Sequence, residues 1–386
     1  MKRIIILCIF LLCFYIIYDV SKDEEKDKNK EEIRVIFISY IELKNYINGK
    51  SGDEVKNNIK EMILNIKKLK FNTVILQVRS FSDAIYKSDI YPWSSVISSS
   101  EGINPGYDVL NYFIKEAHNN NIEIHAWINP YRVRLNNNLS SISSCNPAYK
   151  FINTDNLYVC DSGIYYNPVK NEVIDLIIGG VSELINNYDI DGIHFDDYFY
   201  PDKKISYQNY LDEKSNLTFE QYKMNKVNLL VKRVHKLCKK KKILFGISPS
   251  GNIENNYDYL FSDVKKWGSS SKYVDYLMPQ IYYGFHNQVI NFYSSVNEWD
   301  KLIKDDKVLL IPALAFYKVG LPDKYALEGS NEWILNNDII MKEIIVSRNL
   351  SHYKGFAIYR YDYLFNKELE TSTTMNEIKN IKKILK

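Results

Sequence analysis

Short segments rich in apolar, β-branched and aromatic residues recur along the chain. Between most of these segments, apolar residues return at spacings of three and four, which is the period of an amphipathic helix. Strands that alternate with helices predict a parallel sheet, and strands that are apolar along nearly their whole length predict helices on both faces. The strand-like segments begin at Ile33, Thr73, Ile122, Asp191, Ile243, Val274, Val308 and Gly355.

A closed barrel accommodates these units most economically, so the expected fold class is α/β with a (β/α)8 TIM barrel. An open doubly wound sheet is the alternative, but no G-x-G-x-x-G turn follows the first strand. The connections after the second, third and fourth strands are long and rich in aromatic and polar residues, whereas the returns to the next strands are short. In a barrel these long loops lie at the C-terminal ends of the strands, where active sites are found.

The N-terminal segment has a different composition. Lys2 and Arg3 precede an apolar run over residues 4–18, and an acidic, lysine-rich stretch follows it. This order predicts an uncleaved signal anchor over residues 1–20, a charged linker over 21–32 and a barrel domain over 33–386. Because positive charge at the start holds that end in the cytoplasm, we expect a single-pass protein of the cell membrane with an extracytoplasmic barrel.

Charge and cysteine content restrict the partners. The 386-residue chain has a net charge of +3, which argues against nucleic acid as a partner because phosphate neutralisation needs a concentrated basic face. The basic run at residues 239–242 is expected to end a helix. Cys145 and Cys160 lie in one loop-like region and are candidates for a disulfide in an oxidising compartment. No cofactor is expected, and the oligomeric state is left open.

Polar side chains gather where the predicted strands end. A single polar residue there is usually a helix cap or turn former, and Asp108 and Asn167 are expected to be such caps. Polar ends on seven strands that converge on one rim instead predict a functional site. The candidates are Glu42, Gln77, Arg79, Asp83, His125, Trp127, Asn129, His194, Asp196, Asp197, Tyr198, Gln280, Tyr282, Tyr283 and Asp362.

The stretch "DGIHFDDYFYP", residues 191–201, carries the densest set of these candidates. Period-two alternation directs His194, Asp196 and Tyr198 toward the barrel axis and leaves Asp197 on the turn, while Asp191 is expected to be structural. Carboxylates at such a rim, surrounded by aromatic residues, favour glycoside hydrolysis: one carboxyl donates a proton to the leaving oxygen and the other stays ionised.

Asp196 and Asp197 are therefore the first catalytic candidates, and Glu42 and Asp83 compete as the second carboxylate. The remaining candidates, Asp362 included, are expected to bind substrate. A divalent metal held by His125, His194 and Asp196 is the chemical alternative, but no H-x-H or H-E-x-x-H pattern supports it and no metal is expected. A serine nucleophile has less support because the "SPSG" segment at residue 248 is not G-x-S-x-G.

Four separated motifs resemble the bacterial glycosyl-hydrolase-like family 10. They are "NTVILQVRSFSDAIYKSDIYPWS", "GYDVLNYFIKEAHNNNIEIHAWINPYRV", "DGIHFDDYFYP" and "VDYLMPQIYYGF", in one order from about Ile33 to the eighth strand. The resemblance implies a TIM barrel and a substrate among cell-wall or other β-linked glycans, with peptidoglycan glycan strands the leading candidate. The family pattern highlights Gln77, Arg79, Asp83, His125, Trp127, Asn129, Asp196, Asp197, Gln280 and Tyr282.

The same stretch is also spaced like the D-x-x-D-x-D-x-E strand of chitinase-type barrels. His194 and Tyr198 occupy the second and last acidic positions, so a chitinase mechanism that needs the final glutamate is in doubt. Two other functions stay open: a carbohydrate-binding or wall-tethering barrel without catalysis, and a metal-dependent polysaccharide deacetylase.

Overall fold

The computed structural model describes residues 32–385. Its centre is a nine-stranded sheet built from parallel strand pairs. The order along the sheet is β10-β9-β8-β7-β3-β2-β1-β12-β11. The strands are β1 (Ile33–Ile38), β2 (Thr73–Arg79), β3 (Glu123–Ile128), β7 (Gly192–Phe195), β8 (Leu244–Ile247), β9 (Tyr276–Leu277), β10 (Leu309–Leu310), β11 (Ala313–Ala315) and β12 (Gly355–Tyr359).

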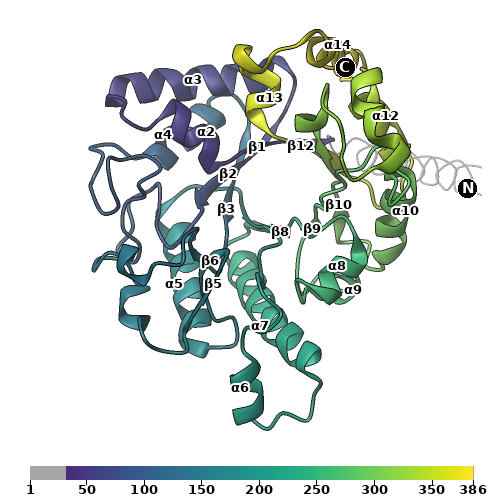
Figure 1. Ribbon diagram of the computed structural model, residues 1–386. Helices are drawn as coiled ribbons and strands as arrows, with labels where there is room; N and C mark the ends of the chain where they lie inside the picture. The colour runs from purple at the N-terminus through teal and green to yellow at the C-terminus, as the bar shows by residue number, and fades with distance from the viewer. Residues whose placement is uncertain (1–31, 386) are drawn as a thin grey trace, which may run out of the picture. The chain divides into compact units, whose positions relative to one another are not determined.

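The two end strands of this order, β10 and β11, are separated in the chain only by Ile311 and Pro312. β10 pairs with β9 and β11 pairs with β12, and a further parallel bridge joins Gln280 to Ala313. Since proline cannot donate a backbone hydrogen bond, Pro312 divides what is otherwise one strand. The sheet therefore curls into a ring (Figure 1), which is the TIM-barrel-like architecture that the strand and helix pattern predicts.

Helices lie outside this ring (Figure 1). The apolar residues of α3 at positions 55, 59, 62, 63 and 66 are all buried, as their spacing predicts. The helices are α2 (Tyr40–Tyr46), α3 (Gly52–Lys68), α4 (Val109–His118), α5 (Asn171–Asn187), α6 (Tyr207–Asp212), α7 (Phe219–Lys240), α8 (Ile253–Asp258), α9 (Val264–Gly268), α10 (Phe292–Leu302), α11 (Glu332–Leu335), α12 (Ile339–Ser347), α13 (Tyr361–Phe365) and α14 (Ser372–Ile384).

The helix caps agree with the sequence at one position and differ at another. Asp108 caps α4 by accepting a hydrogen bond from the backbone N–H of Asn111 at 2.9 Å. The prediction for Asn167 is wrong, because α5 begins only at Asn171. The Asn167 amide donates instead to the carbonyl of Asp155 and the side chain of Asn209, both at 2.8 Å, so it joins the loop before β5 (Leu157–Cys160) to α6.

The long connection between β3 and α5 contains structure that the sequence pattern does not reveal. A three-stranded antiparallel sheet forms there from β4 (Arg132–Arg134), β5 (Leu157–Cys160) and β6 (Gly163–Tyr166), with short 3-10 turns at Leu139–Ser141 and Tyr149–Phe151. Cys145 and Cys160 are both free thiols, so the disulfide considered from the sequence is not formed.

The predicted signal anchor and nearly all of the predicted linker lie outside the described residues. Among residues 32–385, no helix is long and apolar enough to cross a membrane. The residues from Arg34 onward form one compact unit with a continuous apolar core.

A buried carboxylate lies in the outer layer of this unit. Glu343, on α12, has no exposed surface, and neither of its carboxylate oxygens has a hydrogen-bond partner among residues 32–385. Burial, together with the nearby Glu377 carboxylate, raises the pKa of Glu343 well above its ordinary value. Near neutral pH the folded protein therefore keeps a proton on Glu343 that the unfolded chain releases. As a result, Glu343 lowers the free energy of unfolding as the pH rises.

Replacing Glu343 with leucine is expected to raise the free energy of unfolding at pH 8 by about 1–3 kcal/mol, because an unpartnered buried polar group is removed. The gain should be smaller at pH 5, where the unfolded chain retains more of its proton at this position. Urea unfolding at both pH values measures the difference. The matched control, Glu377→Leu, should lower stability, since the Glu377 carboxylate accepts the backbone N–H groups of Ile339 and Met341 at 2.9 and 3.0 Å. A loss of stability in Glu343→Leu at both pH values would contradict this account.

Candidate active site

A cavity of about 170 Å³ opens where the parallel strands end. Its lining residues come from the C-terminal ends of six strands or from the segments that directly follow them, which is the rim expected from the sequence. They are Phe37, Trp127, Asp196, Asp197, Tyr198, Ser248, Gln280, Tyr282 and Tyr359.

Asp196 is buried in the cavity wall and accepts three hydrogen bonds. Its Oδ2 accepts the indole N–H of Trp127 at 2.9 Å and the amide of Asn129 at 3.2 Å, and its Oδ1 accepts the backbone N–H of Tyr198 at 3.4 Å. Burial raises the pKa of Asp196, while the Arg132 guanidinium and these donors oppose the rise. The donors therefore stabilise the ionised form of this carboxylate.

Asp197 lines the same cavity, although alternation alone places it on a turn. Burial raises the pKa of Asp197 to about 7, and the neighbouring Asp196 carboxylate contributes in the same direction, while a hydrogen bond from Gln280 opposes it. The two adjacent carboxyl groups therefore differ in their surroundings: three donors stabilise the anion of Asp196, and the pKa of Asp197 beside it lies near neutral pH. This division is the arrangement that acid and base chemistry requires.

A hydrogen-bonded chain of buried polar side chains lies inside the ring, behind the cavity. The Tyr276 hydroxyl bonds to Nδ1 of His125 at 2.9 Å and to Nδ1 of His194 at 3.0 Å. His194 Nε2 bonds in turn to the hydroxyl of Ser248 at 2.7 Å, and the carbonyl of Ser248 accepts the Gln280 amide at 3.0 Å. Since Gln280 also bonds to Asp197, the chain positions a wall of the cavity.

Replacing Tyr276 with phenylalanine is expected to lower the free energy of unfolding by about 1–3 kcal/mol, because two buried imidazole nitrogens lose their partner. Tyr131→Phe is the matched control: Tyr131 is also fully buried, but its hydroxyl has no partner among the described residues. Chemical denaturation of both variants measures the contrast. Equal losses in the two variants would show that the shared hydroxyl contributes nothing.

Aromatic rings form the other walls of the cavity. Tyr282 and Tyr359 stack with centroids 5.8 Å apart, and Phe37 meets Trp127 edge to face at 5.6 Å. Tyr198 has 46% of its surface exposed at the mouth. Such flat apolar faces suit the apolar faces of sugar rings, and the polar groups between them can bond to hydroxyls.

The model of the family described as Glycosyl hydrolase-like 10 matches residues 32–330. The chain belongs to this family. The resemblance of the four motifs is thereby confirmed, and the chain is placed among glycoside hydrolase-like proteins.

Two curated relatives are named as glycosyl hydrolases. This family member is 32% identical over 336 residues to glycosyl hydrolase YngK of Bacillus subtilis, which covers 80% of this chain and 63% of YngK. It is 30% identical over 334 residues to glycosyl hydrolase DigH of Escherichia coli K12, which covers 78% of this chain and 74% of DigH. The chain thus matches less than two thirds of the length of YngK.

Solved structures with low identity share the fold. The glycoside hydrolase domain of PgaB (BpsB) from Bordetella bronchiseptica aligns with a TM-score of 0.56 at 12% identity, over 87% of this chain and 96% of that chain. The catalytic domain of β-amylase from Paenibacillus polymyxa aligns with a TM-score of 0.55 at 11% identity, over 92% and 98%. These similarities support the barrel-like architecture of the family member.

Six residues predicted from the sequence line the cavity, and others support it from behind. Trp127, Asp196, Asp197, Tyr198, Gln280 and Tyr282 line it. Asn129, His125 and His194 contact those residues or the hydrogen-bonded chain behind them. Phe37, Ser248 and Tyr359 were not among the candidates. Period-two alternation was the available signal for two of them. It places Phe37 on the same strand face as Val35, and Tyr359 on the same strand face as Ala357.

Glu42 and Asp362 lie outside the cavity lining. Glu42 has no exposed surface, and its carboxylate accepts the backbone N–H of Ser39 at 2.9 Å, as well as the Ser39 hydroxyl and the Arg360 guanidinium. Asp362 is 3% exposed beside this pair, and burial together with Glu42 raises its pKa to about 6. These contacts join α2 to the segment that follows β12. Both carboxyl groups therefore have a structural role.

The four remaining candidates also lie away from the cavity. Gln77 accepts the backbone N–H of Tyr40 at 3.0 Å, and the buried Arg79 guanidinium stacks over the Tyr91 ring at 4.0 Å. Tyr283 packs against the apolar core. Asp83 lines a separate hollow, and burial raises its pKa to about 6.

The metal alternative needs His125, His194 and Asp196 in one coordination sphere. In the part of the chain that the structure describes, no group of three or more His, Cys, Asp or Glu residues is arranged to hold a metal ion. Both ring nitrogens of His194 are engaged by Tyr276 and Ser248, and burial lowers its pKa well below the ordinary value. The histidines thus act as hydrogen-bonded polar core.

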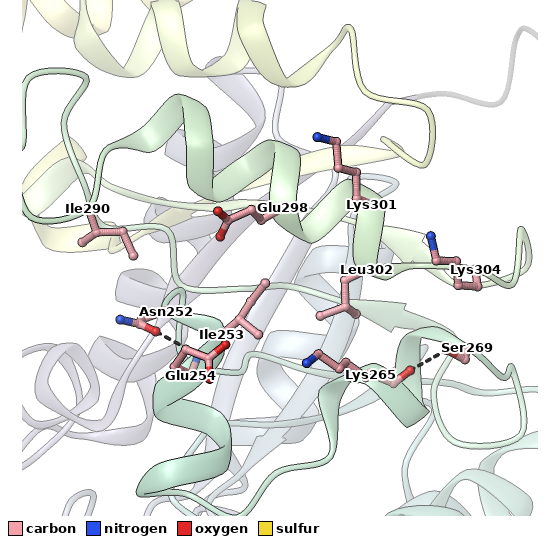
Figure 2. A pocket seen from close by; sticks show the side chains of 10 residues that line it. All are labelled: Asn252, Ile253, Glu254, Lys265, Ser269, Ile290, Glu298, Lys301, Leu302 and Lys304. Carbon is pink, nitrogen blue, oxygen red and sulfur yellow. Dashed lines mark hydrogen bonds between the residues drawn. The ribbon is translucent and has the colours of Figure 1, made fainter.

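A larger pocket of about 600 Å³ lies between α8, α9 and α10 (Figure 2). Three lysines and two glutamates line it together with Ile253 and Leu302. In Figure 2 the ammonium groups of Lys301 and Lys304 point away from Lys265, so the charges do not converge on one point. The smaller cavity at the strand ends, with its two carboxyl groups and aromatic walls, is the candidate active site.

Proposed function

We propose that this protein is a glycoside hydrolase that cleaves a cell-wall polysaccharide, with peptidoglycan glycan strands as its substrate. One observation carries the proposal: Asp196 and Asp197 line one aromatic-walled cavity, where hydrogen-bond donors surround Asp196 and burial beside that carboxylate raises the pKa of Asp197 to about 7. Family membership and the glycosyl hydrolase names of the relatives support the reaction class. The predicted signal anchor, which would hold the barrel outside the cell, supports the choice of a wall polymer.

In the proposed reaction, Asp197 is the general acid. It transfers its proton to the glycosidic oxygen as the bond to the anomeric carbon breaks. Asp196 remains ionised, held in place by Trp127 and Asn129, and its negative charge stabilises the oxocarbenium-like transition state. A water oxygen forms the new bond to the anomeric carbon, and the proton that this water loses restores the acid form of Asp197. The aromatic walls orient the sugar ring and reduce its contact with water.

Mass spectrometry of digested glycan strands tests this proposal. Purified peptidoglycan, with and without its peptide stems, is incubated with the protein and with an Asp196→Asn variant. We expect shortened strands with new reducing ends from the unchanged protein and far fewer from the variant. Retention on the insoluble wall without new reducing ends would favour a carbohydrate-binding protein, and release of acetate would favour a deacetylase.

A further inference from the structure

The candidate active site is small for a polymer. Its volume of about 170 Å³ lies below the roughly 300–1,000 Å³ that pockets for small ligands usually enclose. A glycan strand that reacts there must leave most of its length on other parts of the rim. The loops after the strands next to the cavity are where such contacts would be found.

A second hollow of about 390 Å³ lies in these loops. It is formed by the long connections that follow β2 and β3, and both connections leave the same C-terminal rim that carries the cavity. Among its lining residues are Phe81, Asp83, Ser95, Ser99, Arg134 and Asn136.

Arg132 connects the hollow to the cavity. Its guanidinium carbon lies 5.2 Å from the centre of the Tyr198 ring, which lines the cavity, and 4.9 Å from that of Phe81, which lines the hollow. Arg132 Nε donates to the carbonyl of Ser80 at 3.1 Å, and no carboxylate of the described residues lies within ion-pair distance of the guanidinium. Tyr198, Arg132 and Phe81 thus form a continuous row of flat groups from one depression to the other.

The lining of the hollow indicates what it binds. Ser95, Ser99 and Asn136 are exposed and offer hydroxyl and amide groups. The charge of Arg134 is balanced by Glu101 at 2.5 Å. A hollow with hydroxyl, amide and carboxyl groups and one aromatic ring suits a neutral, hydroxylated ring, whereas an anion would find the guanidinium of Arg134 already paired.

We propose that this hollow is a second carbohydrate-binding site, which takes neutral sugar rings of the same strand that enters the cavity, with the strand crossing the row of Tyr198, Arg132 and Phe81. The inference rests on the proposed function, because it takes the cavity to be where the glycosidic bond is broken. It adds that the protein acts on extended strands and that contacts in the hollow favour long strands over short ones.

A blocking substitution tests the second site. Ser99 is exposed, so tryptophan there fills the hollow without disturbing the core. We expect Ser99→Trp to lower the ratio of kcat/KM for long glycan strands to that for a tetrasaccharide by about tenfold, the effect of losing one modest set of contacts. Ser372→Trp, at an exposed serine at the start of α14, is the matched control and should keep the unchanged ratio. An unaltered ratio in Ser99→Trp, or the same fall in the control, would overturn the inference.

Calorimetric titration with long strands separates this inference from the proposed reaction. If the unchanged protein hydrolyses no glycan, the proposed function fails. The second site still stands in that case if long strands bind more tightly than the tetrasaccharide and Ser99→Trp removes the difference. Equal affinities for long strands in the unchanged protein and Ser99→Trp would refute the site, whatever the outcome for hydrolysis.

Discussion

Asp197→Asn is expected to lower kcat/KM on glycan strands by about a hundredfold to ten-thousandfold, the range that a positioned general acid contributes. The amide has nearly the same shape as the protonated carboxyl group but cannot transfer a proton to the glycosidic oxygen. Asp212→Asn, at an exposed aspartate on α6, is the control and should retain full activity. Steady-state release of reducing ends measures both variants. Full activity of Asp197→Asn would remove this residue from the mechanism.

The pH dependence of kcat follows from the same assignment. Because the pKa of Asp197 is raised to about 7, the acid is protonated below that pH and loses its proton above it. Activity should therefore fall as the pH rises through about 7, and it should fall again at low pH when Asp196 becomes protonated. Since the two carboxyl groups interact, the two limbs report the pair and not single residues. A rate that keeps rising above pH 8 would contradict the role of Asp197 as acid.

Glu42→Ala is expected to lower the free energy of unfolding by about 3 kcal/mol, because it removes the nearest carboxylate partner of the Arg360 guanidinium and leaves only Asp362, at 3.8 Å. A matched control exists on the next helix. Glu54 forms the same capping box with Ser51 as Glu42 forms with Ser39, but it is exposed. Glu54→Ala should therefore cost much less. Thermal and urea unfolding measure the two variants.

Glu42→Gln separates a structural role of this residue from a catalytic one. The glutamine keeps the shape of the side chain and some of its hydrogen bonds, so the protein should fold with reduced stability. At a temperature where the variant is folded, kcat should stay close to that of the unchanged protein. A fall in kcat as large as that of Asp197→Asn would instead make Glu42 the second catalytic carboxylate, as the sequence allows.

Some features of the site are readable from local pattern. Alternation along residues 192–198 directs His194 and Asp196 inward, and the structure places both there. The same rule puts Asp197 on a turn, yet it lines the cavity because the chain bends directly after β7 ends at Phe195. Local pattern describes regular strands and stops being informative where the strand ends, which is where the cavity lies.

Other features depend on residues far apart in the chain. Glu42 pairs with Arg360, which lies 318 residues away in the sequence. Asp196 accepts a hydrogen bond from Trp127, a residue of the cavity wall that lies 69 residues away. Glu42 and Asp196 look alike in the sequence, since both are carboxylates near the end of a strand. Glu42 is paired with Arg360 inside the fold, whereas Asp196 faces the cavity. This difference arises only when the strands close into the barrel.

The sequence by itself determined the alternation of strands and helices, the rim at which polar residues gather and the family to which the chain belongs. These follow from period, composition and motif, which are properties of neighbouring residues. The tertiary structure alone decided which of the candidate residues share one cavity, which carboxyl group keeps its proton and which side chains are occupied in the core. Those properties depend on burial and on long-range partners, and a periodic pattern carries no information about either.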